Sequence, residues 1–183
     1  MNKRFPLATL FLTIFIDLLG FGIILPILPT YAAELGANGF VVGLLGTAFA
    51  IANFLCLPFW GTLSDRIGRR PVILVSLVIA VVSYLIFSQA HTLLMLFIAR
   101  ILAGIGAANL SAAQAYITDI TPPQDRAKSM GMIGAAFGLG FIFGPPLGGI
   151  VKHRFGIEYV GYVVAGLCLL NLIMAYFLLP EDF

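Results

Sequence analysis

Charged side chains are scarce in this sequence of 183 residues. Lys, Arg, Asp and Glu make up 10% of it, whereas an ordinary soluble domain has about 25%. The two cysteines, Cys56 and Cys168, are too few for a disulfide framework, and no cluster has the spacing of a metal site. No nucleophile–base set or phosphate-binding loop is apparent. We therefore expect no enzyme, no catalytic residue, no metal and no cofactor, and the net charge of +2 does not indicate nucleic-acid binding.

Apolar residues take the place of the missing charge. They make up 61% of the sequence, the mean hydropathy is +1.06, and uncharged runs reach or exceed the roughly 18–20 residues that a helix needs to cross a bilayer. A polar segment at 88–92 separates the third run from the fourth. The sequence therefore predicts an all-α integral membrane protein, with one six-helix domain over residues 1–183. The expected spans are 6–30, 40–63, 71–88, 93–118, 129–151 and 159–179.

Lys and Arg are distributed unevenly between the expected loops. With the N-terminus inside, seven of them fall in cytoplasmic segments and two in outer loops, while Arg100 lies within a span. This bias follows the positive-inside rule, so we expect both termini in the cytoplasm and the protein in the inner (plasma) membrane of the cell. The cytoplasmic residues are Lys3, Arg4, Arg66, Arg69, Arg70, Arg126 and Lys128, and the outer ones are Lys152 and Arg154.

The sequence also repeats itself. Residues 58–68 (PFWGTLSDRIG) match 146–156 (PLGGIVKHRFG) at an offset of 88, and 18–22 (LLGFG) weakly match 102–106 (LAGIG). Both offsets move a residue on by three spans, which reverses its direction in the membrane. The pattern predicts a 3+3 inverted repeat, as found in secondary transporters, with units at about 1–90 and 91–183. Chance similarity among apolar helices is the alternative.

A compact charged segment connects the second and third expected spans. Residues 61–71 read GTLSDRIGRRP, and four charges in so short a turn can lock two helix ends at the cytoplasmic surface. Asp65 can face a helix N-terminus, where the dipole favours a carboxylate, and the arginines can bridge to Asp119. The alternative is a simple positive-inside anchor, which would not need Asp65 or Gly68. The residues of interest are Gly61, Asp65, Arg66, Gly68, Arg69, Arg70 and Asp119.

The charged segment resembles the signature G-x-L-[SA]-D-R-x-G-R-[RK] of the major facilitator superfamily at every defined position. Three further segments, 19–29, 96–108 and 140–149, resemble in order the motifs of its twelve-span drug–proton antiporters in spans one, four and five. The pattern as a whole is similar to the tetracycline-efflux type. Two departures are Ala103, where Gln is frequent, and Ser83–Tyr84, where tetracycline exporters carry an acidic residue, so tetracycline itself is not implied as the substrate.

This resemblance implies the N-terminal six-helix half of such a transporter. The charged turn would gate the cytoplasmic side by docking on a second half, and the glycine-rich fifth span would pack against that half. Glycines at small-xxx-small spacing permit such close approach. A glycine face used only inside the six-helix bundle is the alternative. The motif residues are Gly140, Gly144, Pro145, Gly148 and Gly149, and Gly134 and Gly138 extend the same spacing.

Two ionisable residues lie inside expected spans, Asp17 and Arg100. A cleaved signal peptide would not carry a carboxylate in the middle of so long an apolar run, so 6–30 is interpreted as a span. Intramembrane charges are functional candidates because burying them is costly. We hypothesise that Asp17 loads and releases a proton while Arg100, paired directly or across water, biases its affinity; a static ion pair is the alternative. Weaker pathway candidates, which interhelical hydrogen bonding would also explain, are Asn53, Asn109 and Gln114.

Six spans provide only one wall of a transport cavity, because alternating access needs two halves. The resemblance implies export of drug-like molecules driven by the proton gradient, within the lipid bilayer and with a second six-helix half or a second copy as partner. A facilitator without proton coupling is a transport alternative. The other alternative is a truncated or half-size membrane protein that acts as an interaction module without transport.

Overall fold

The computed structural model describes residues 4–180, which form seven α-helices and one short 3-10 helix, with no strand among them. Six segments are long and apolar enough to cross a membrane. The six predicted spans are therefore confirmed, with α4 and α5 together making the fourth. The elements are α1 (Arg4–Glu34), α2 (Gly39–Ile67), α3 (Arg69–Ser88), α4 (Leu93–Ala107), α5 (Asn109–Ile120), η1 (Pro123–Asp125), α6 (Arg126–Phe155) and α7 (Ile157–Leu178).

The helices run further than the predicted spans. The second span was expected to end at residue 63, but α2 continues to Ile67, and α6 begins at Arg126 rather than near 129. The extra turns carry charged residues such as Asp65 and Lys128. A helix does not end where the hydrocarbon ends, because long charged side chains can reach back to the interface.

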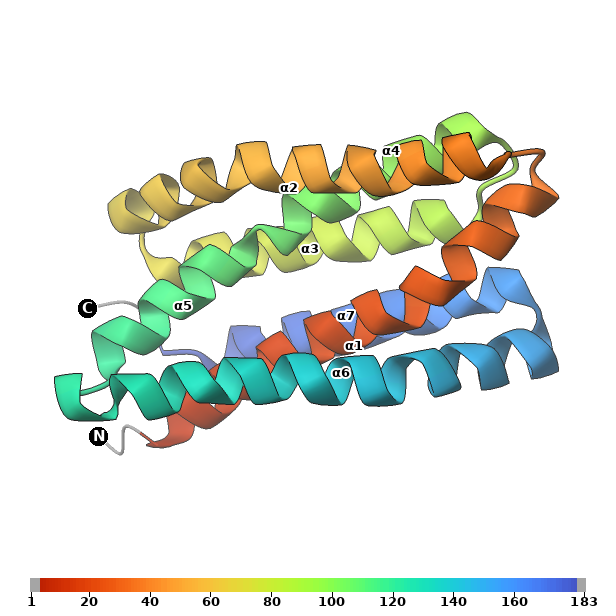
Figure 1. The fold of residues 1–183 in the computed structure, drawn as a ribbon. Helices are drawn as coiled ribbons and strands as arrows, with labels where there is room; N and C mark the ends of the chain where they lie inside the picture. Colours follow the sequence, from red (N-terminus) through yellow and green to blue (C-terminus); the bar gives the residue numbers. More distant parts are fainter. Residues whose placement is uncertain (1–3, 181–183) are drawn as a thin grey trace.

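The spans alternate in direction, so that α1 begins and α7 ends at one end of the bundle (Figure 1). We call this the basic end, because Arg66, Arg69, Arg70 and Arg126 lie there; the loops 35–38 and 89–92 lie at the opposite end. The most extensive contacts join α1 to α6, α3 to α7 and α4, and α2 to α4. Helices α2 and α6 therefore lie at opposite edges of the bundle, with α1, α3 and α7 between them (Figure 1).

Two turns of the bundle have the same conformation. Gly68 separates α2 from α3 and Gly156 separates α6 from α7, each as a single residue between helices. Their φ angles are 101° and 104°, values that only glycine adopts without strain. The two glycines are 88 residues apart, the offset of the sequence repeat.

Helix α1 lies in both hydrophobic clusters of the core. Towards the opposite end, Ile24 packs with Phe87 of α3 and Val164 of α7. Towards the basic end, Leu10 belongs to a second cluster that includes Trp60 of α2 and Ala175 of α7. Helix α1 is therefore buried along its length, and its most extensive contacts are with α6 and α7.

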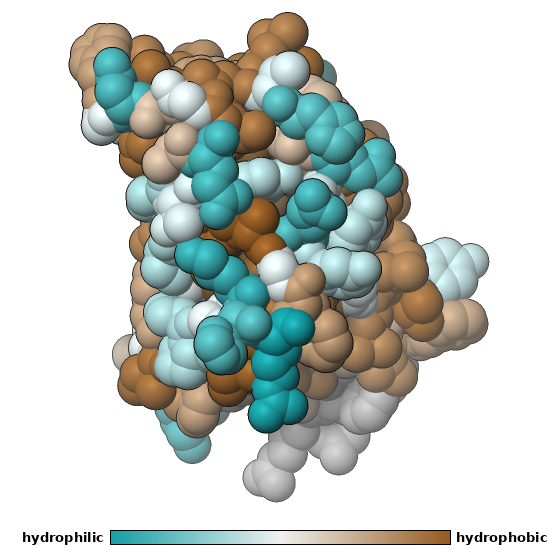
Figure 2. All heavy atoms as spheres, turned by 90° about the vertical axis from the view of Figure 1, so that its right-hand side faces the viewer, coloured by the Kyte–Doolittle hydropathy of each residue, from teal (hydrophilic) through white to brown (hydrophobic). Residues whose placement is uncertain are grey.

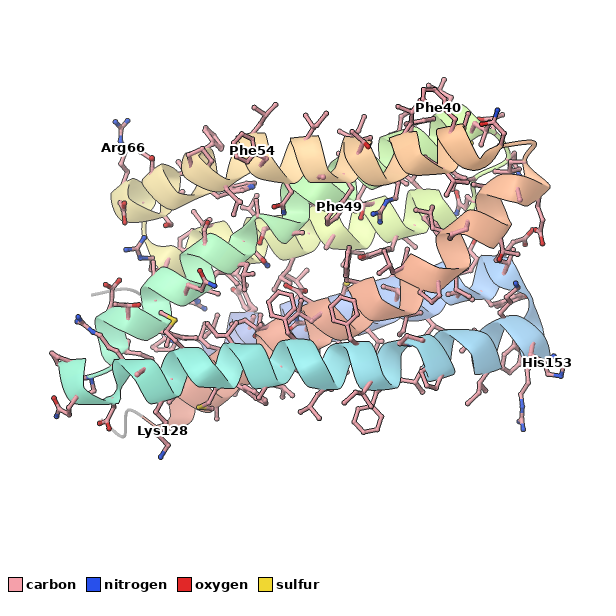
Figure 3. The ribbon with its side chains drawn as sticks, in the orientation of Figure 1. Phe40, Phe49, Phe54, Arg66, Lys128 and His153 are labelled. Atoms are coloured by element: carbon pink, nitrogen blue, oxygen red, sulfur yellow. The ribbon has the colours of Figure 1, made fainter. Side chains whose placement is uncertain are left out.

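The surface is that of a membrane protein. Figure 2 looks onto the opposite end, where hydrophilic side chains gather, while hydrophobic side chains cover the flanks. Large apolar residues such as Phe54 and Phe177 are each 75% exposed, and in Figure 3 Phe54 points away from the bundle. An apolar surface of this extent is unfavourable in water but matches lipid.

Candidate functional site

A cavity of about 220 Å³ lies in the middle of the bundle, and each α-helix from α1 to α7 contributes to its wall. Most of its lining is aliphatic or aromatic, and the polar lining groups are few, which is typical of small-molecule sites. The lining residues are Ile14, Asp17, Leu18, Phe21, Phe49, Asn53, Ala80, Tyr84, Ala103, Gly106, Ala107, Asn109, Leu110, Phe137 and Cys168.

Asp17 is held in this wall by two side-chain amides. Asn109 Nδ2 donates to Asp17 Oδ2 at 2.9 Å, and Asn171 Nδ2 donates to Asp17 Oδ1 at 3.3 Å. Asn171 also donates to the backbone carbonyl of Thr13 at 3.1 Å, which ties α7 to α1. Each carboxylate oxygen thus has a donor while the side chain stays open to the cavity.

Sequence reasoning did not identify Asn171. It singled out Asn109 as a pathway candidate but did not predict its bond to Asp17. Asn171 lies on the buried face of α7 with Val164, Cys168 and Ala175. An amide on that face of an otherwise apolar span was the signal available, because a polar group placed there needs a partner on a neighbouring helix.

The sequence predicted one continuous helix for the fourth span, but the structure has two, α4 and α5. The span is interrupted at Ala108, between α4 and α5. The carbonyls in the last turn of a helix have no N–H donor within that helix. Two side chains of α2 donate there instead: Asn53 Nδ2 to Gly104 O at 3.3 Å and Trp60 Nε1 to Ile105 O at 2.8 Å. The interruption places Asn109 at the first turn of α5, facing Asp17.

Arg100 does not form the hypothesised direct pair with Asp17. Its side chain is 3% exposed, and its guanidinium lies over the Phe49 ring, 4.4 Å from the ring centre. Phe49 in turn lies 5.2 Å from the Phe21 ring. Among residues 4–180, no hydrogen bond or ion pair to Arg100 is formed, and its Nε is buried without an acceptor.

Of the remaining pathway candidates, one lines the cavity and one does not. Asn53 lines the cavity, whereas Gln114 lies further along α5 and is not among the lining residues. Tyr84 of α3 lines the cavity at the place where the resemblance would have put an acidic residue. Cys168 of α7 is buried in the same wall.

At the basic end, Arg69 joins three elements. Its guanidinium pairs with Asp65 of α2 at 2.5 Å and with Asp119 of α5 at 3.1 Å, and it donates to Ser64 Oγ at 2.6 Å. The predicted bridge from an arginine to Asp119 is therefore present. Both carboxylates are more than half exposed, so each ion pair contributes only about 0–1 kcal/mol, which suits a contact that can open.

The other residues of the charged segment differ in what they contact. Asp65 caps no helix: it lies in the last turn of α2, and the start of α3 has no side-chain cap. Arg70 donates to Tyr176 O at 2.6 Å and lies over the Tyr176 ring, which ties α3 to α7. Arg66 points away from the bundle (Figure 3), and Gly61 has open space beside it.

The glycines of α6 occupy two faces rather than the single face that their spacing predicted. A Cβ on Gly140 would lie 2.9 Å from the backbone of Leu18, and one on Gly144 would lie 2.6 Å from that of Gly22. Gly148 packs on α1 in the same way. Three of the antiporter-motif glycines thus serve the α1–α6 contact inside the bundle. A Cβ would meet nothing within 4 Å at Gly131, Gly134, Gly138 or Gly149, and α6 continues through Pro145.

Comparison with known proteins settles the family. A family model described as Major Facilitator Superfamily matches residues 10–183. This chain belongs to the major facilitator superfamily. Superfamily members are transporters, in agreement with the sequence prediction that the chain is not an enzyme, and the resemblance drawn from its motifs is confirmed.

The superfamily relatives include two drug-resistance proteins. The chain is 36% identical over 185 residues to the class C tetracycline resistance protein of Escherichia coli, covering all of this chain and 46% of the relative. It is 35% identical over 165 residues to the quinolone resistance protein NorA of Staphylococcus aureus, covering 88% of this chain and 42% of the relative. The chain therefore spans about half the length of the curated relatives it matches.

Solved superfamily structures have the same fold. The crystal structure of the human organic anion transporter MFSD10 (TETRAN) aligns with a TM-score of 0.85 at 29% identity, covering 99% of this chain and 48% of that one. A bacterial homologue of the human lysosomal transporter Spinster, inward-facing and unoccupied, also aligns at 0.85 but at 19% identity, which supports the fold alone.

Proposed function

We propose that this chain forms one six-helix half of a proton-coupled exporter of small drug-like molecules, with Asp17 as the proton carrier. The observation that carries the proposal is a half-buried carboxylate in an otherwise largely apolar cavity, held by one amide on each oxygen. An ionisable group at this depth is costly, and transporters retain such groups for proton relays. The relatives named for tetracycline and quinolone resistance support export of drug-like compounds.

The surroundings of Asp17 allow it to exist with and without its proton. The two amides stabilise the carboxylate form through charge-assisted hydrogen bonds, and the cavity gives a proton or a ligand access to the same oxygens. The other ionisable groups nearby are Tyr84 of α3 and Cys168 of α7 in the cavity wall, and Arg100 of α4 under Phe49. Protonation would weaken the attraction of Asp17 for a cationic group, which couples proton binding to ligand release.

A second six-helix unit would complete the transporter. Helices α2 and α6 lie at opposite edges of the bundle (Figure 1), and both carry glycines beside open space, Gly43 and Gly46 on α2 and Gly134 and Gly138 on α6. Such positions let a partner helix approach closely. The partner is a second half or a second copy of the chain. The matching turns at Gly68 and Gly156 support a 3+3 inverted repeat within this unit.

Replacement of Asp17 by Asn tests the proton assignment. In inside-out vesicles that export a fluorescent drug, Asp17→Asn should abolish the dependence of export on the pH gradient while the protein remains folded. Asp125→Asn, in the exposed η1 helix, is the matched control and should leave export unchanged. Undiminished gradient-driven export in Asp17→Asn would contradict the assignment, and export by the unsubstituted protein without gradient dependence would identify a facilitator.

A further inference from the structure

Both carboxylate oxygens of Asp17 have hydrogen-bond donors as partners. Asn109 Nδ2 donates to Oδ2 at 2.9 Å and Asn171 Nδ2 donates to Oδ1 at 3.3 Å. These bonds suit a carboxylate, which only accepts, whereas a protonated carboxyl has an O–H that must donate. An amide nitrogen cannot accept that bond. A proton on Asp17 therefore requires one of its partners to change.

The other ionisable groups near Asp17 do not supply the acceptor. They are Tyr84 of α3 and Cys168 of α7 in the cavity wall, and Arg100 of α4 under Phe49. The cavity residues contributed by α2, α5 and α6 carry no ionisable group. Within residues 4–180, the side chain of Asp17 is hydrogen-bonded to its two amide partners and to none of these groups. The response to its proton therefore falls to an amide.

Of the two carboxylate oxygens, Oδ1 gives up its donor more readily. The bond from Asn109 to Oδ2 is the shorter one, 2.9 Å against 3.3 Å, and the short charge-assisted hydrogen bonds are the strong ones. Asn109 also lines the cavity, whereas Asn171 does not line it and has no exposed surface. We therefore expect the proton on Oδ1, where Asn171 has to respond.

The orientation of the Asn171 amide is determined by its two partners. Nδ2 donates to Asp17 Oδ1 and to Thr13 O, and both of these atoms are acceptors, so the amide oxygen cannot take the place of the nitrogen. That oxygen is buried without a hydrogen-bond partner, and Thr13 Oγ1 is buried in the same way. Buried polar atoms without a partner are costly and uncommon, and these two lie on residues that are hydrogen-bonded to each other.

One movement gives partners to both of these atoms and to the new O–H. If the Asn171 amide turns over, its nitrogen and oxygen exchange places. Oδ1 then accepts from protonated Asp17, and Nδ2 can donate to Thr13 Oγ1. The Thr13 carbonyl loses the amide but keeps its place in the backbone hydrogen bonding of α1, because Thr13 is an interior residue of that helix.

We propose that Asn171 turns its amide over when Asp17 takes up a proton. The proton enters from the cavity, forms the O–H bond on Oδ1 and removes the negative charge, and the turned amide accepts from that O–H. The link between α7 and α1 moves from the backbone of Thr13 to its hydroxyl. Asn171 is thus a positioning residue that responds to the proton, and the inference rests on the proposed function, which takes Asp17 as the proton carrier.

Infrared difference spectroscopy of the purified protein, between alkaline and acidic buffer, follows both groups. Acidification of the unsubstituted protein should produce the carbonyl band of a neutral carboxyl, which Asp17→Asn lacks. It should also shift an asparagine carbonyl band, identified by isotope labelling of asparagine, to lower frequency, because Asn171 Oδ1 gains a hydrogen bond. Asn171→Leu should abolish that shift and move the Asp17 band to higher frequency, since its O–H then has no acceptor.

Thr13→Val tests the same movement with a smaller change, because valine keeps the shape of threonine and removes only the hydroxyl. It should reduce the asparagine shift, since the turned Nδ2 has no acceptor, while the Asp17 carboxyl band persists. Thr47→Val, at an exposed threonine of α2, is the matched control and should change neither band. Asn109→Leu should keep the asparagine shift.

The outcomes separate the amide turn from the proton carrier. An Asp17 carboxyl band without an asparagine shift contradicts the turn and leaves the proposed function intact. The same conclusion follows if the shift persists in Asn171→Leu, disappears in Asn109→Leu, or is unchanged in Thr13→Val. A folded protein that shows no Asp17 carboxyl band in acid contradicts the proposed function, and the inference with it.

Discussion

At the scale of single residues, the interior of the bundle depends on a few buried amides. Asn171 has no exposed surface and uses its amide nitrogen twice, towards Asp17 and towards the Thr13 carbonyl. A buried acceptor that loses its donor costs about 1–3 kcal/mol. Asn171 therefore stabilises the fold at Thr13 and positions the proposed proton carrier through the same group.

Asn171→Leu should lower the free energy of unfolding by about 1–3 kcal/mol, since leucine has a similar volume but no donor. Thermal unfolding in detergent measures this. The double variant with Asp17→Asn should show a coupling of about 0.5–3 kcal/mol, as residues that share a hydrogen bond do.

Leu170→Ala is the control for this experiment, because that neighbour on α7 is 58% exposed; it should have little effect. Additive effects of Asn171→Leu and Asp17→Asn would mean that the hydrogen bond between the two side chains contributes nothing.

At the scale of helices, side chains of α2 make the interruption of the fourth span possible. Trp60 Nε1 and Asn53 Nδ2 donate to two carbonyls at the end of α4. The hydrocarbon core of a bilayer contains no water that could donate to these carbonyls instead. The interruption then determines which residue begins α5, and that residue is Asn109. A hydrogen-bonding pattern on one helix thus positions a site residue on another.

Trp60→Phe should destabilise the protein by about 1–3 kcal/mol, because the Ile105 carbonyl keeps its buried position without a donor. Thermal unfolding followed by circular dichroism measures the loss. Phe54→Leu, at a 75% exposed residue of the same helix, is the control and should change little. Equal stability of Trp60→Phe and the unsubstituted protein would show that the fourth span is interrupted for another reason.

The two glycine faces of α6 predict opposite results for the same substitution. Gly144→Ala places a Cβ 2.6 Å from the Gly22 backbone, so α1 and α6 must separate, at a cost of about 1–3 kcal/mol. Gly134→Ala meets nothing within 4 Å and should be neutral or slightly stabilising, since alanine favours the helix. Thermal unfolding in detergent compares them, and similar effects of both would contradict the assignment of faces.

At the scale of the whole molecule, the proposed second unit needs a helix face on which to pack. The cavity lies in the middle of the bundle, α2 and α6 lie at the edges (Figure 1), and the chain covers less than half of the length of its curated relatives. Glycines beside open space on both edge helices are suited to a partner helix rather than to lipid chains. The face of α6 left open by α1 is therefore the one expected to join a second unit.

Gly134→Leu and Gly138→Leu should weaken that assembly and leave the fold intact. Light scattering of the protein in mild detergent should show a fall from the mass of two six-helix units to that of one. Gly166→Leu, which places a similar side chain beside open space on α7, is the control and should not change the mass. An unsubstituted protein that is a lone monomer without export would instead favour the interaction-module alternative.

The sequence by itself determined the membrane fold, the number of spans and the family, because lipid requires long apolar helices and the motifs are local in sequence. It also identified Asp17, Asn109 and Asn53 as candidates and the bridge from an arginine to Asp119. Each of these features follows from composition, from spacing along one helix, or from charges close to a turn.

Only the tertiary structure decided which of these groups meet. The Asn171 bond to Asp17 joins residues far apart in the chain, and Phe49 rather than Asp17 contacts Arg100 because α2 passes beside α4. The glycine spacing on α6 gave no indication of which face α1 would cover. Periodicity gives the faces of a helix, whereas the rotation of that helix against its neighbours is set by packing of the whole bundle, which no local pattern contains.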